Sequence, residues 1–390
     1  MRIKQAGAFL RLVLFQFRKD LYNFKKIRTK EIMLTDMYNS NRNVRHMLSN
    51  IKTNYKKGSC IMKKNTKRII TATGIAAGTA AVASLSAYVT TKALIDTALD
   101  REMPKVMKNA NKRISGEKSS GEYTAYLENS SRRLAEQPNE IVKITAHDGE
   151  TLVGHYFPCE NPERVIIAFH GWRSSWHRDF GMISDFWHRS NCSVLYVEQR
   201  GQNNSGGKHM GFGLTERYDC LDWLKWETER CGSCIPVYLA GISMGAATVL
   251  MASGLQLPQN VHGIMADCGF TSANAIWEHI AKDNLHIRFR VRSAIADMMC
   301  RRKINVGSKE YSTTDALKHT NVPVIFIHGS DDNFVPVNMT YENYMACASP
   351  KELLIVPGAD HCMSYFMEKE KYENAVKAFW AKYDKSAREA

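Results

Sequence analysis

A serine stands between two glycines in the pentapeptide GISMG at 241–245, directly after the apolar run 237–240. A Gly-x-Ser-x-Gly sequence that follows a strand and begins a helix is typical of a nucleophile elbow, which presents the serine hydroxyl at the end of a sheet. The flanking glycines let strand and helix close around a serine whose backbone is strained. We therefore predict that Ser243 is a nucleophile. An ordinary strand-to-helix turn is the alternative interpretation of the pentapeptide by itself.

Two later loops carry the other groups that such a serine requires. A serine hydroxyl is a weak nucleophile at neutral pH, so a base must take its proton during attack. We predict that this base is His361, which follows an apolar run. A carboxylate must then fix the tautomer of the imidazole and stabilise the imidazolium. Asp332, in the loop after another apolar run, is the first candidate for this acid, and Asp331 and Asp267 are the alternatives.

Backbone donors are also needed for the oxyanion that forms when the serine attacks a carbonyl. One donor is expected from the N–H of the residue after the nucleophile, Met244, and the other from a loop after an earlier strand. The run 164–169 is followed by His170 and Gly171, so the N–H of Trp172 is the predicted second donor. We expect His170 to hold this loop by hydrogen bonding and to have no direct catalytic role.

From about Ile141 to the C-terminus the chain resembles the α/β-hydrolases, specifically the serine aminopeptidase-like branch and bacterial membrane-anchored esterase-like hydrolases. The order Ser, Asp, His is that of the superfamily. The resemblance rests on the motifs HGW at 170–172, EQRGQNNSGG at 198–207, GISMG at 241–245, DCGFTS at 267–272, HGSDDNFVP at 328–336 and GADH at 358–361. The family pattern His-Gly-x-x-Asp-x-x-Val-Pro implies that Asp332 is the acid. Two positions depart from the family, which usually has Asp at Glu198 and His at Gln202.

An α/β fold with a mostly parallel, doubly covered sheet is predicted because apolar runs alternate with helical stretches. The expected strands are 141–146, 151–157, 164–169, 193–198, 236–240, 261–266, 322–328 and 352–356. The Asp-Gly pair at 148–149 predicts that the first two form an antiparallel hairpin. Helices are expected at 180–189, 214–230 and 372–382. The alternation stops at about 270–321, where we expect a short helical cap that lines a substrate pocket.

The N-terminal part of the chain differs in charge. Residues 1–68 hold 18 Lys and Arg against 3 Asp and Glu, whereas 69–390 hold 35 against 36. The segment 69–91 has no charged residue and is long enough to span a bilayer. We predict a transmembrane signal anchor there, with the catalytic domain outside the cytoplasm because of the basic residues before the segment. A cleavable signal peptide that starts at Met62 and a buried soluble helix are the alternatives. The predicted organisation is a basic extension at 1–68, of which 1–61 is untranslated if Met62 is the start, the anchor at 69–91, a spacer at 92–138 and the hydrolase domain at 139–390.

Composition limits the partners. The near-neutral catalytic domain lacks the one-sided positive charge of nucleic-acid-binding domains. The ten cysteines show no framework spacing, and Cys231 and Cys234 lack the two further ligands that a zinc site needs, so we expect mostly free thiols and no metal or cofactor. The predicted function is a serine hydrolase that cleaves an ester, thioester or small amide. An aminopeptidase or acyltransferase with the same triad, and a non-catalytic scaffold, are the alternatives.

Overall fold

The computed structural model describes residues 64–104, 121–290 and 292–384. The chain divides into two compact units, Met1–Ala81 and Val82–Ala390. The second unit holds the sheet and every side chain discussed below. In helix α4 (Lys64–Leu99) side chains are described from Val82 onward.

Eight strands form one sheet in the order β1-β2-β4-β3-β5-β6-β7-β8. The strands are β1 (Glu140–Thr145), β2 (Thr151–Phe157), β3 (Arg164–Phe169), β4 (Cys192–Glu198), β5 (Val237–Ile242), β6 (Val261–Asp267), β7 (Val324–Gly329) and β8 (Lys351–Val356). β1 and β2 form the expected antiparallel hairpin, and β2 is also antiparallel to β4, whereas all pairs from β4 to β8 are parallel. The predicted strands and the mostly parallel sheet are confirmed.

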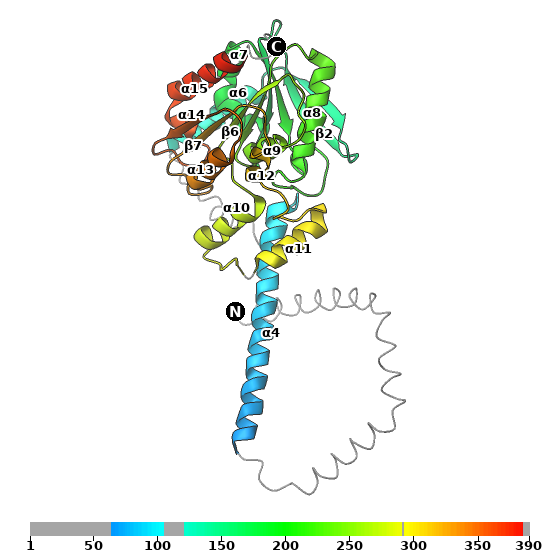
Figure 1. The fold of residues 1–390 in the computed structure, drawn as a ribbon, viewed down its shortest axis with the longest axis vertical. Coiled ribbons are helices and arrows are strands. Elements are labelled where there is room, and N and C mark those ends of the chain that lie inside the picture. The colour runs from blue at the N-terminus through cyan, green and yellow to red at the C-terminus, as the bar shows by residue number, and fades with distance from the viewer. Residues whose placement is uncertain (1–63, 105–120, 291, 385–390) are drawn as a thin grey trace. The chain divides into compact units, whose positions relative to one another are not determined.

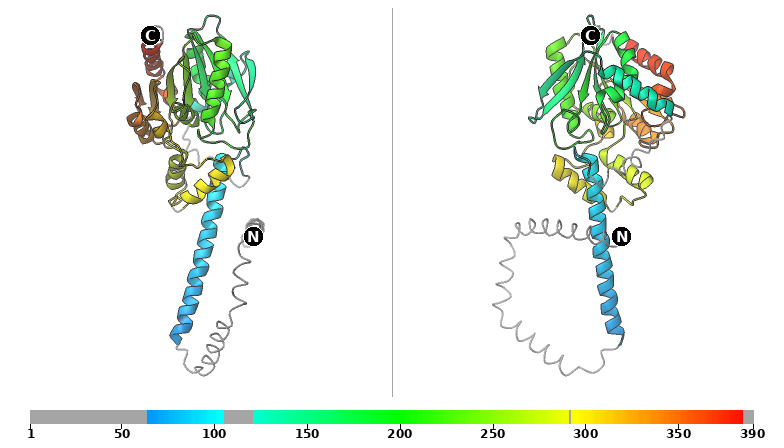
Figure 2. Two further views of the ribbon diagram at one scale, coloured as in Figure 1. Left: turned by 45° about the vertical axis from the view of Figure 1, so that its right-hand side comes forward. Right: turned by 180° about the vertical axis from the view of Figure 1, so that it is seen from behind.

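Helices cover both faces of the sheet, as Figures 1 and 2 show. On one face, one hydrophobic cluster joins the sheet to α6 (Gly121–Ala135), α7 (Trp176–Arg189) and α15 (Lys369–Tyr383). On the other face, a second cluster joins it to α8 (Glu216–Cys231), α9 (Met244–Ala252), α12 (Thr313–Leu317) and α13 (Val337–Ala346). The central strands are buried on both sides, which explains their continuous apolar runs.

The interruption expected at about 270–321 contains α10 (Ala273–His279), the π-helical turn η2 (Ile280–Asn284) and α11 (Ser293–Ile304). These elements pack with one another, with the end of α4 and with the loop before α8 in a third hydrophobic cluster. The short helix α14 (Ser364–Met367) lies between β8 and α15 in the chain.

The range 92–138, expected to be a spacer, contains two elements that pack on the hydrolase domain. Helix α6 buries Tyr123, Leu127 and Leu134 in the first cluster, and α4 buries Ile95 and Leu99 in the third. These segments are therefore part of the folded domain in the structure.

The predicted membrane-spanning helix over 69–91 is not supported. Within the described residues, no helix combines the length and the apolar character that a membrane span requires. Thr91, the expected end of the span, is fully buried in the protein. The basic extension at 1–63 and the side chains of 64–81 lie outside the described residues, and the location of the domain beyond a membrane stays a prediction.

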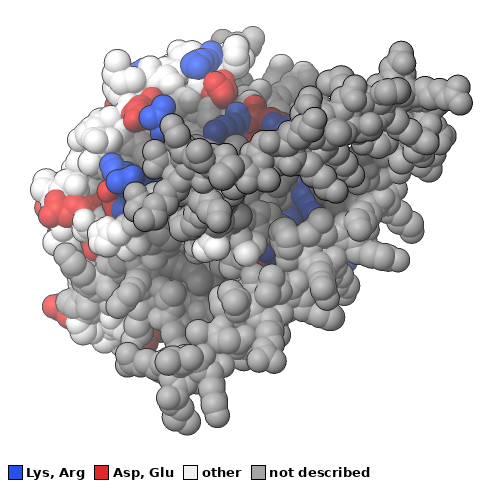
Figure 3. Space-filling model, turned by 90° about the horizontal axis from the view of Figure 1, so that it is seen from below, with Lys and Arg blue, Asp and Glu red and all other residues white. Residues whose placement is uncertain are grey.

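Surface charges of the described residues are mixed. On the face drawn in Figure 3, acidic and basic side chains are interspersed with uncharged ones where described residues are visible, and several opposite charges are neighbours. This distribution agrees with the near-zero net charge counted for 69–390.

Candidate active site

Ser243 occupies the turn between the carboxyl end of β5 and α9, as the pentapeptide predicts. Its backbone has φ 55° and ψ −115°, a left-handed conformation that is strained for a residue with a side chain. A Cβ atom at Gly245 would lie 1.8 Å from the carbonyl oxygen of Phe169, and one at Gly241 would lie 2.3 Å from the backbone of Gly245. Both positions therefore require glycine, because a side chain at either one would force the helix away from the sheet.

The carboxyl ends of four parallel strands bring the predicted residues together. Loops after β3, β5, β7 and β8 carry Trp172, Ser243, Asp332 and His361. After β3 the chain adds β4 on one side of it, and then crosses over to add β5 on the other side. The strand order therefore changes direction between the neighbouring parallel strands β3 and β5. Open α/β sheets place their ligand sites at the carboxyl ends of strands at such a reversal.

Ser243, His361 and Asp332 form one continuous hydrogen-bonded chain. The Ser243 Oγ lies 3.0 Å from His361 Nε2, and His361 Nδ1 lies 2.7 Å from Asp332 Oδ2. A neutral imidazole protonated on Nδ1 donates to the carboxylate and leaves the Nε2 lone pair to accept the serine proton. A serine, a histidine and a carboxylate that are hydrogen-bonded in this order can carry out acyl transfer.

The charges of the pair reinforce each other. Burial alone would raise the pKa of Asp332, but the charge of His361 and hydrogen bonds from His328 and His361 outweigh burial and hold this pKa well below its usual range. Burial alone would lower the pKa of His361, but the Asp332 carboxylate raises it well above its ordinary value. Asp332 therefore stays ionised, and a carboxylate in this position stabilises the protonated form of the adjacent imidazole.

His328, which the sequence analysis did not assign, holds Asp332 in place. Its Nε2 lies 3.1 Å from Asp332 Oδ2 and 2.8 Å from the Val335 carbonyl oxygen, and because both partners are acceptors, Nε2 must carry the proton. The Thr340 hydroxyl then donates to Nδ1 over 2.6 Å. The other carboxylate oxygen, Oδ1, accepts the backbone N–H groups of Phe334 and Val335 at 2.9 and 2.8 Å. The motif His-Gly-x-x-Asp contained the signal, since a histidine at a strand end four residues before the acid can reach its carboxylate.

The alternative acids have other positions. Asp331 is exposed and its carboxylate accepts the Ser330 hydroxyl at 2.6 Å. Asp267 contributes its backbone oxygen, which accepts the Ser243 N–H at 2.9 Å, and burial raises the pKa of its side chain to about 6. Among the described residues, Asp332 is the carboxylate that hydrogen-bonds to the His361 imidazole, whereas Asp360 accepts the His361 backbone N–H at 2.8 Å.

The loop after β3 that contains Gly171 and Trp172, here called the oxyanion loop because Trp172 is a predicted donor, is held by hydrogen bonds. The Gly171 N–H donates to the Asp179 carboxylate at 2.6 Å. Within the described residues, no hydrogen bond is made by the Trp172 N–H, and Met244 is the first residue of α9, where helix geometry leaves N–H groups without an intrahelical partner. Both predicted donors thus have N–H groups available at the carboxyl end of the strands, where Ser243 also lies.

His170 has the loop-holding environment that we expected. It is fully buried, its Nδ1 donates to the Gly171 carbonyl oxygen at 2.8 Å, and its Nε2 accepts the Gln199 N–H at 3.2 Å. Burial lowers the pKa of His170, so the ring is neutral. Its two nitrogens are occupied by the backbone and do not reach the triad.

The two departures from the family pattern both hold loops around the site. Glu198 accepts from His155 at 2.9 Å and from the Asn204 backbone N–H at 2.5 Å. Gln202 accepts the backbone N–H of Arg173, the residue after the predicted oxyanion donor, at 2.6 Å. Glu198 and Gln202 therefore satisfy polar groups of these loops.

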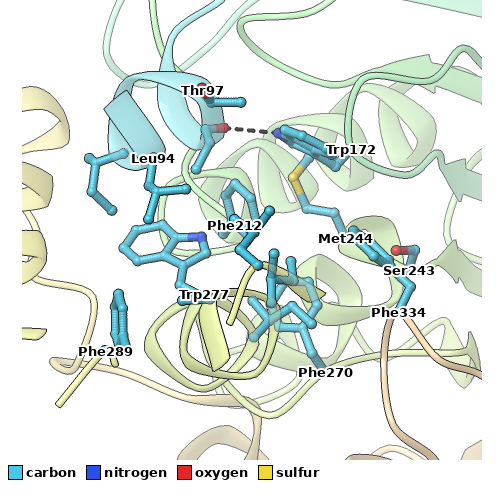
Figure 4. A pocket seen from close by; sticks show the side chains of 16 residues that line it. Leu94, Thr97, Trp172, Phe212, Ser243, Met244, Phe270, Trp277, Phe289 and Phe334 are labelled. Carbon is cyan, nitrogen blue, oxygen red and sulfur yellow. Dashed lines mark hydrogen bonds between the residues drawn. The ribbon is translucent and has the colours of Figure 1, made fainter. Parts of the chain in front are cut away.

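An apolar pocket of about 630 Å³, including space open to solvent, adjoins Ser243 (Figure 4). Its sixteen lining residues are uncharged. They are Leu94, Ile95, Thr97, Ala98, Trp172, Phe212, Ser243, Met244, Phe270, Ile276, Trp277, Ile280, Ala281, Leu285, Phe289 and Phe334. The cap contributes the expected lining, but the four residues from α4 were not foreseen.

Two groups of side chains in the described residues could hold a metal ion. One consists of Cys268, His361 and Cys362, and the other of His147, Asp219 and Asp222. In the first, burial holds the pKa of the Cys268 thiol well above its ordinary value, which disfavours the thiolate form that binds metals. In the second, the Asp219 carboxylate is already paired with the guanidinium of Arg200. The absence of a metal or cofactor stays a prediction. Cys231 and Cys234 are both free thiols.

Comparison with known proteins places this fold. No family model matches the sequence. The chain is 29% identical over 232 residues to the uncharacterized protein YqkD of Bacillus subtilis. The matched region covers 58% of this chain and 73% of that protein. It is 22% identical over 229 residues to the uncharacterized protein YfhR of Escherichia coli K12, spanning 57% of this chain and 73% of that protein.

Solved structures resemble the chain at low sequence identity. An esterase from Pyrococcus furiosus superposes with a TM-score of 0.54 and 19% identity, covering 65% of this chain and 93% of the esterase. Est1E from Butyrivibrio proteoclasticus, solved with ferulic acid bound, has a TM-score of 0.50 and 19% identity, and the match covers 62% of this chain and 98% of Est1E. The α/β-hydrolase GrgF from a Penicillium species has a TM-score of 0.50 and 17% identity, and the match covers 63% of this chain and 99% of GrgF. The chain therefore has the α/β-hydrolase fold.

Proposed function

We propose that this protein is a serine hydrolase that cleaves a carboxylic ester through an acyl-enzyme intermediate. The observation that carries the proposal is the hydrogen-bonded chain from Ser243 through His361 to Asp332, located at the elbow of an α/β-hydrolase fold. The esterases among the structural neighbours support the same class of reaction.

The proposed reaction begins when Ser243 Oγ attacks the ester carbonyl carbon as its proton moves to His361 Nε2. The carbonyl oxygen becomes an oxyanion that accepts from the N–H groups of Met244 and Trp172, while Asp332 stabilises the imidazolium. When the intermediate collapses, the bond to the leaving alkoxide breaks and His361 returns the proton to it. Water then attacks the acyl-enzyme with the same base, which releases the acid and restores the Ser243 hydroxyl.

The pocket supports an ester in preference to a peptide with a free amino terminus. An aminopeptidase binds the charged amine of its substrate, and a carboxylate near the cleft is the group suited to that task. None of the sixteen residues that line the pocket beside Ser243 is acidic. A thioester or an uncharged amide shares the same chemistry, and transfer of the acyl group to an acceptor other than water differs only in the second step.

A fluorophosphonate probe tests this proposal. The folded protein is expected to form a covalent adduct that peptide mapping locates at Ser243, and to hydrolyse short p-nitrophenyl esters. Ser243→Ala is expected to lose both, whereas Ser253→Ala, a buried serine after the same helix, keeps both. A wild-type protein that is folded but is neither labelled nor active on esters is a non-catalytic scaffold, and the proposal is then wrong.

A further inference from the structure

We propose that the last two turns of helix α4 form one wall of an acyl-binding site, and that this site takes an uncharged apolar acyl group. This inference rests on the proposed function and extends it to a substrate class. It assigns substrate selectivity to a segment that precedes the eight-stranded sheet by about 40 residues of sequence.

The first argument is the position of the pocket relative to the triad. In Figure 4, Ser243 and Met244 lie at one side of the pocket, and Leu94 and Phe289 lie at the other. The pocket is lined by the residues of both predicted oxyanion donors, Trp172 and Met244, but His361 is not among its lining residues in the described structure. Since His361 must reach the leaving group to return a proton, a group bound in the pocket is the acyl part of the substrate.

The second argument is the chemistry of the wall. Leu94, Ile95 and Ala98 of α4 line the pocket together with Trp277 and Phe289 of the cap region. These side chains offer dispersion contacts and no charge, so they favour a hydrocarbon chain or ring over a polar or ionised acyl group. Burial of a methylene group contributes enough to raise a binding or rate constant by about fourfold.

The third argument is that the end of α4 is fixed to the oxyanion loop. The indole Nε1 of Trp172 donates to the Ala98 carbonyl oxygen at 2.9 Å. The Arg173 guanidinium donates to the carbonyl oxygens of Thr97 and Arg101 at 2.8 and 3.0 Å. A cation at the carbonyl end of a helix satisfies acceptors that lack intrahelical partners and complements the helix dipole. The helix end and the oxyanion loop therefore form one unit beside Ser243.

Further contacts attach this helix end to the rest of the domain. The Met210 N–H donates to the Leu99 carbonyl oxygen at 2.7 Å, and the Lys303 ammonium pairs with Asp96 at 3.1 Å. Ile95 and Leu99 are 1% and 0% exposed. The wall is thus a packed element of the site, held by backbone hydrogen bonds, an ion pair and apolar burial.

The test varies the acyl chain with a fixed leaving group. We would measure kcat/KM for p-nitrophenyl acetate and p-nitrophenyl octanoate with the full chain and take their ratio. Wild type is expected to prefer octanoate. Ala98→Leu adds a branched side chain to the pocket and should reduce the octanoate-to-acetate ratio at least tenfold, the loss of about two buried methylene groups. Ala93→Leu, the same change on the same helix at a position that does not line the pocket, should leave the ratio within twofold.

A second variant covers the case in which Ala98→Leu does not fold. Leu94→Ala widens the far side of the pocket and should shift the preferred chain to a longer or bulkier acyl group, measured with the decanoate and dodecanoate esters. Labelling by the fluorophosphonate probe reports that each variant is folded with a competent serine. The inference is overturned if the labelled variants keep the wild-type chain-length profile, or if wild type prefers acetate. Loss of labelling and of all ester hydrolysis in wild type would instead refute the proposed function.

Discussion

Replacing Asp332 by asparagine tests the role of the acid most directly, because the surroundings fix the orientation of the new amide. Oδ1 of Asp332 accepts two backbone N–H groups, those of Phe334 and Val335, so the amide oxygen of asparagine must occupy that position. The amide NH2 then occupies the position of Oδ2, 2.7 Å from His361 Nδ1. An NH2 group can only donate there, so His361 must present a lone pair on Nδ1 and carry its proton on Nε2.

The consequence is a base in the wrong tautomer. With its proton on Nε2, His361 cannot accept the proton of Ser243, and the charge that stabilised the imidazolium is gone. In serine hydrolases with this arrangement, such a change lowers kcat by about 10⁴-fold, which corresponds to about 5.4 kcal/mol of transition-state stabilisation. The His328 N–H at the same oxygen loses an acceptor but keeps the Val335 carbonyl oxygen at 2.8 Å, so the fold should persist.

The assay is hydrolysis of p-nitrophenyl butyrate by wild type, Asp332→Asn and Asp331→Asn, with thermal unfolding as the check on structure. Asp331→Asn is the matched control, because this neighbouring carboxylate is exposed and bonds to Ser330 rather than to His361. It should keep kcat within about threefold. A folded Asp332→Asn variant with kcat within tenfold of wild type would refute the assignment of the acid and the tautomer argument.

Three further predictions concern the elbow, the base and a buried carboxyl group. Gly245→Ala would put a methyl group 1.8 Å from the Phe169 carbonyl oxygen and should destabilise the fold by more than about 4 kcal/mol in denaturant unfolding, whereas Gly121→Ala, with open space around it, should not. Because His361 must be neutral to act as base and the adjacent carboxylate raises its pKa, kcat/KM should rise with pH with a midpoint above the ordinary histidine value of about 6.5, and a midpoint at or below that value would contradict this. Burial raises the pKa of Glu227 to about 7, so its stabilising neutral form is present at low pH and is lost as pH rises through about 7. Glu227→Gln should therefore be more stable than wild type at pH 8, by at most about 3 kcal/mol, and no more stable near pH 4.

The sheet could be predicted from the sequence because its strands are buried on both faces. Runs such as 164–169 and 237–240 are continuously apolar, and this pattern hardly depends on what the rest of the chain does. The elbow was equally local, since glycine at 241 and 245 is required by contacts of the turn itself. Assignment of the acid needed more than local pattern, because Asp331 and Asp332 are adjacent and only the folded loop separates an exposed carboxylate from a buried one.

The substrate wall could not be predicted in the same way, although part of its signal is visible. Thr91, Ile95, Ala98 and Leu99 lie at helical spacing and are buried together, which is the pattern of one helix face packed on a protein. Thr91 is also the last residue of the uncharged segment 69–91, which predicts a membrane span, and Ile95, Ala98 and Leu99 follow it after Lys92. The uncharged composition of 69–91 favours a membrane span, and it hides the short helical pattern of buried residues that begins where this segment ends.

The contacts of Trp172 connect the proposed acyl wall to the proposed oxyanion donor. Its backbone N–H is the proposed oxyanion donor, its ring lines the pocket, and its indole N–H holds the Ala98 carbonyl oxygen of α4. A change that displaces the end of α4 must therefore move both the acyl wall and the residue that stabilises the oxyanion. Catalysis requires the oxyanion donors to be placed to within a fraction of an ångström. A substitution that changes only the volume of a wall side chain and a change that displaces the end of α4 should therefore affect the kinetics differently. The first changes kcat/KM selectively among acyl chains, whereas the second lowers kcat for all of them.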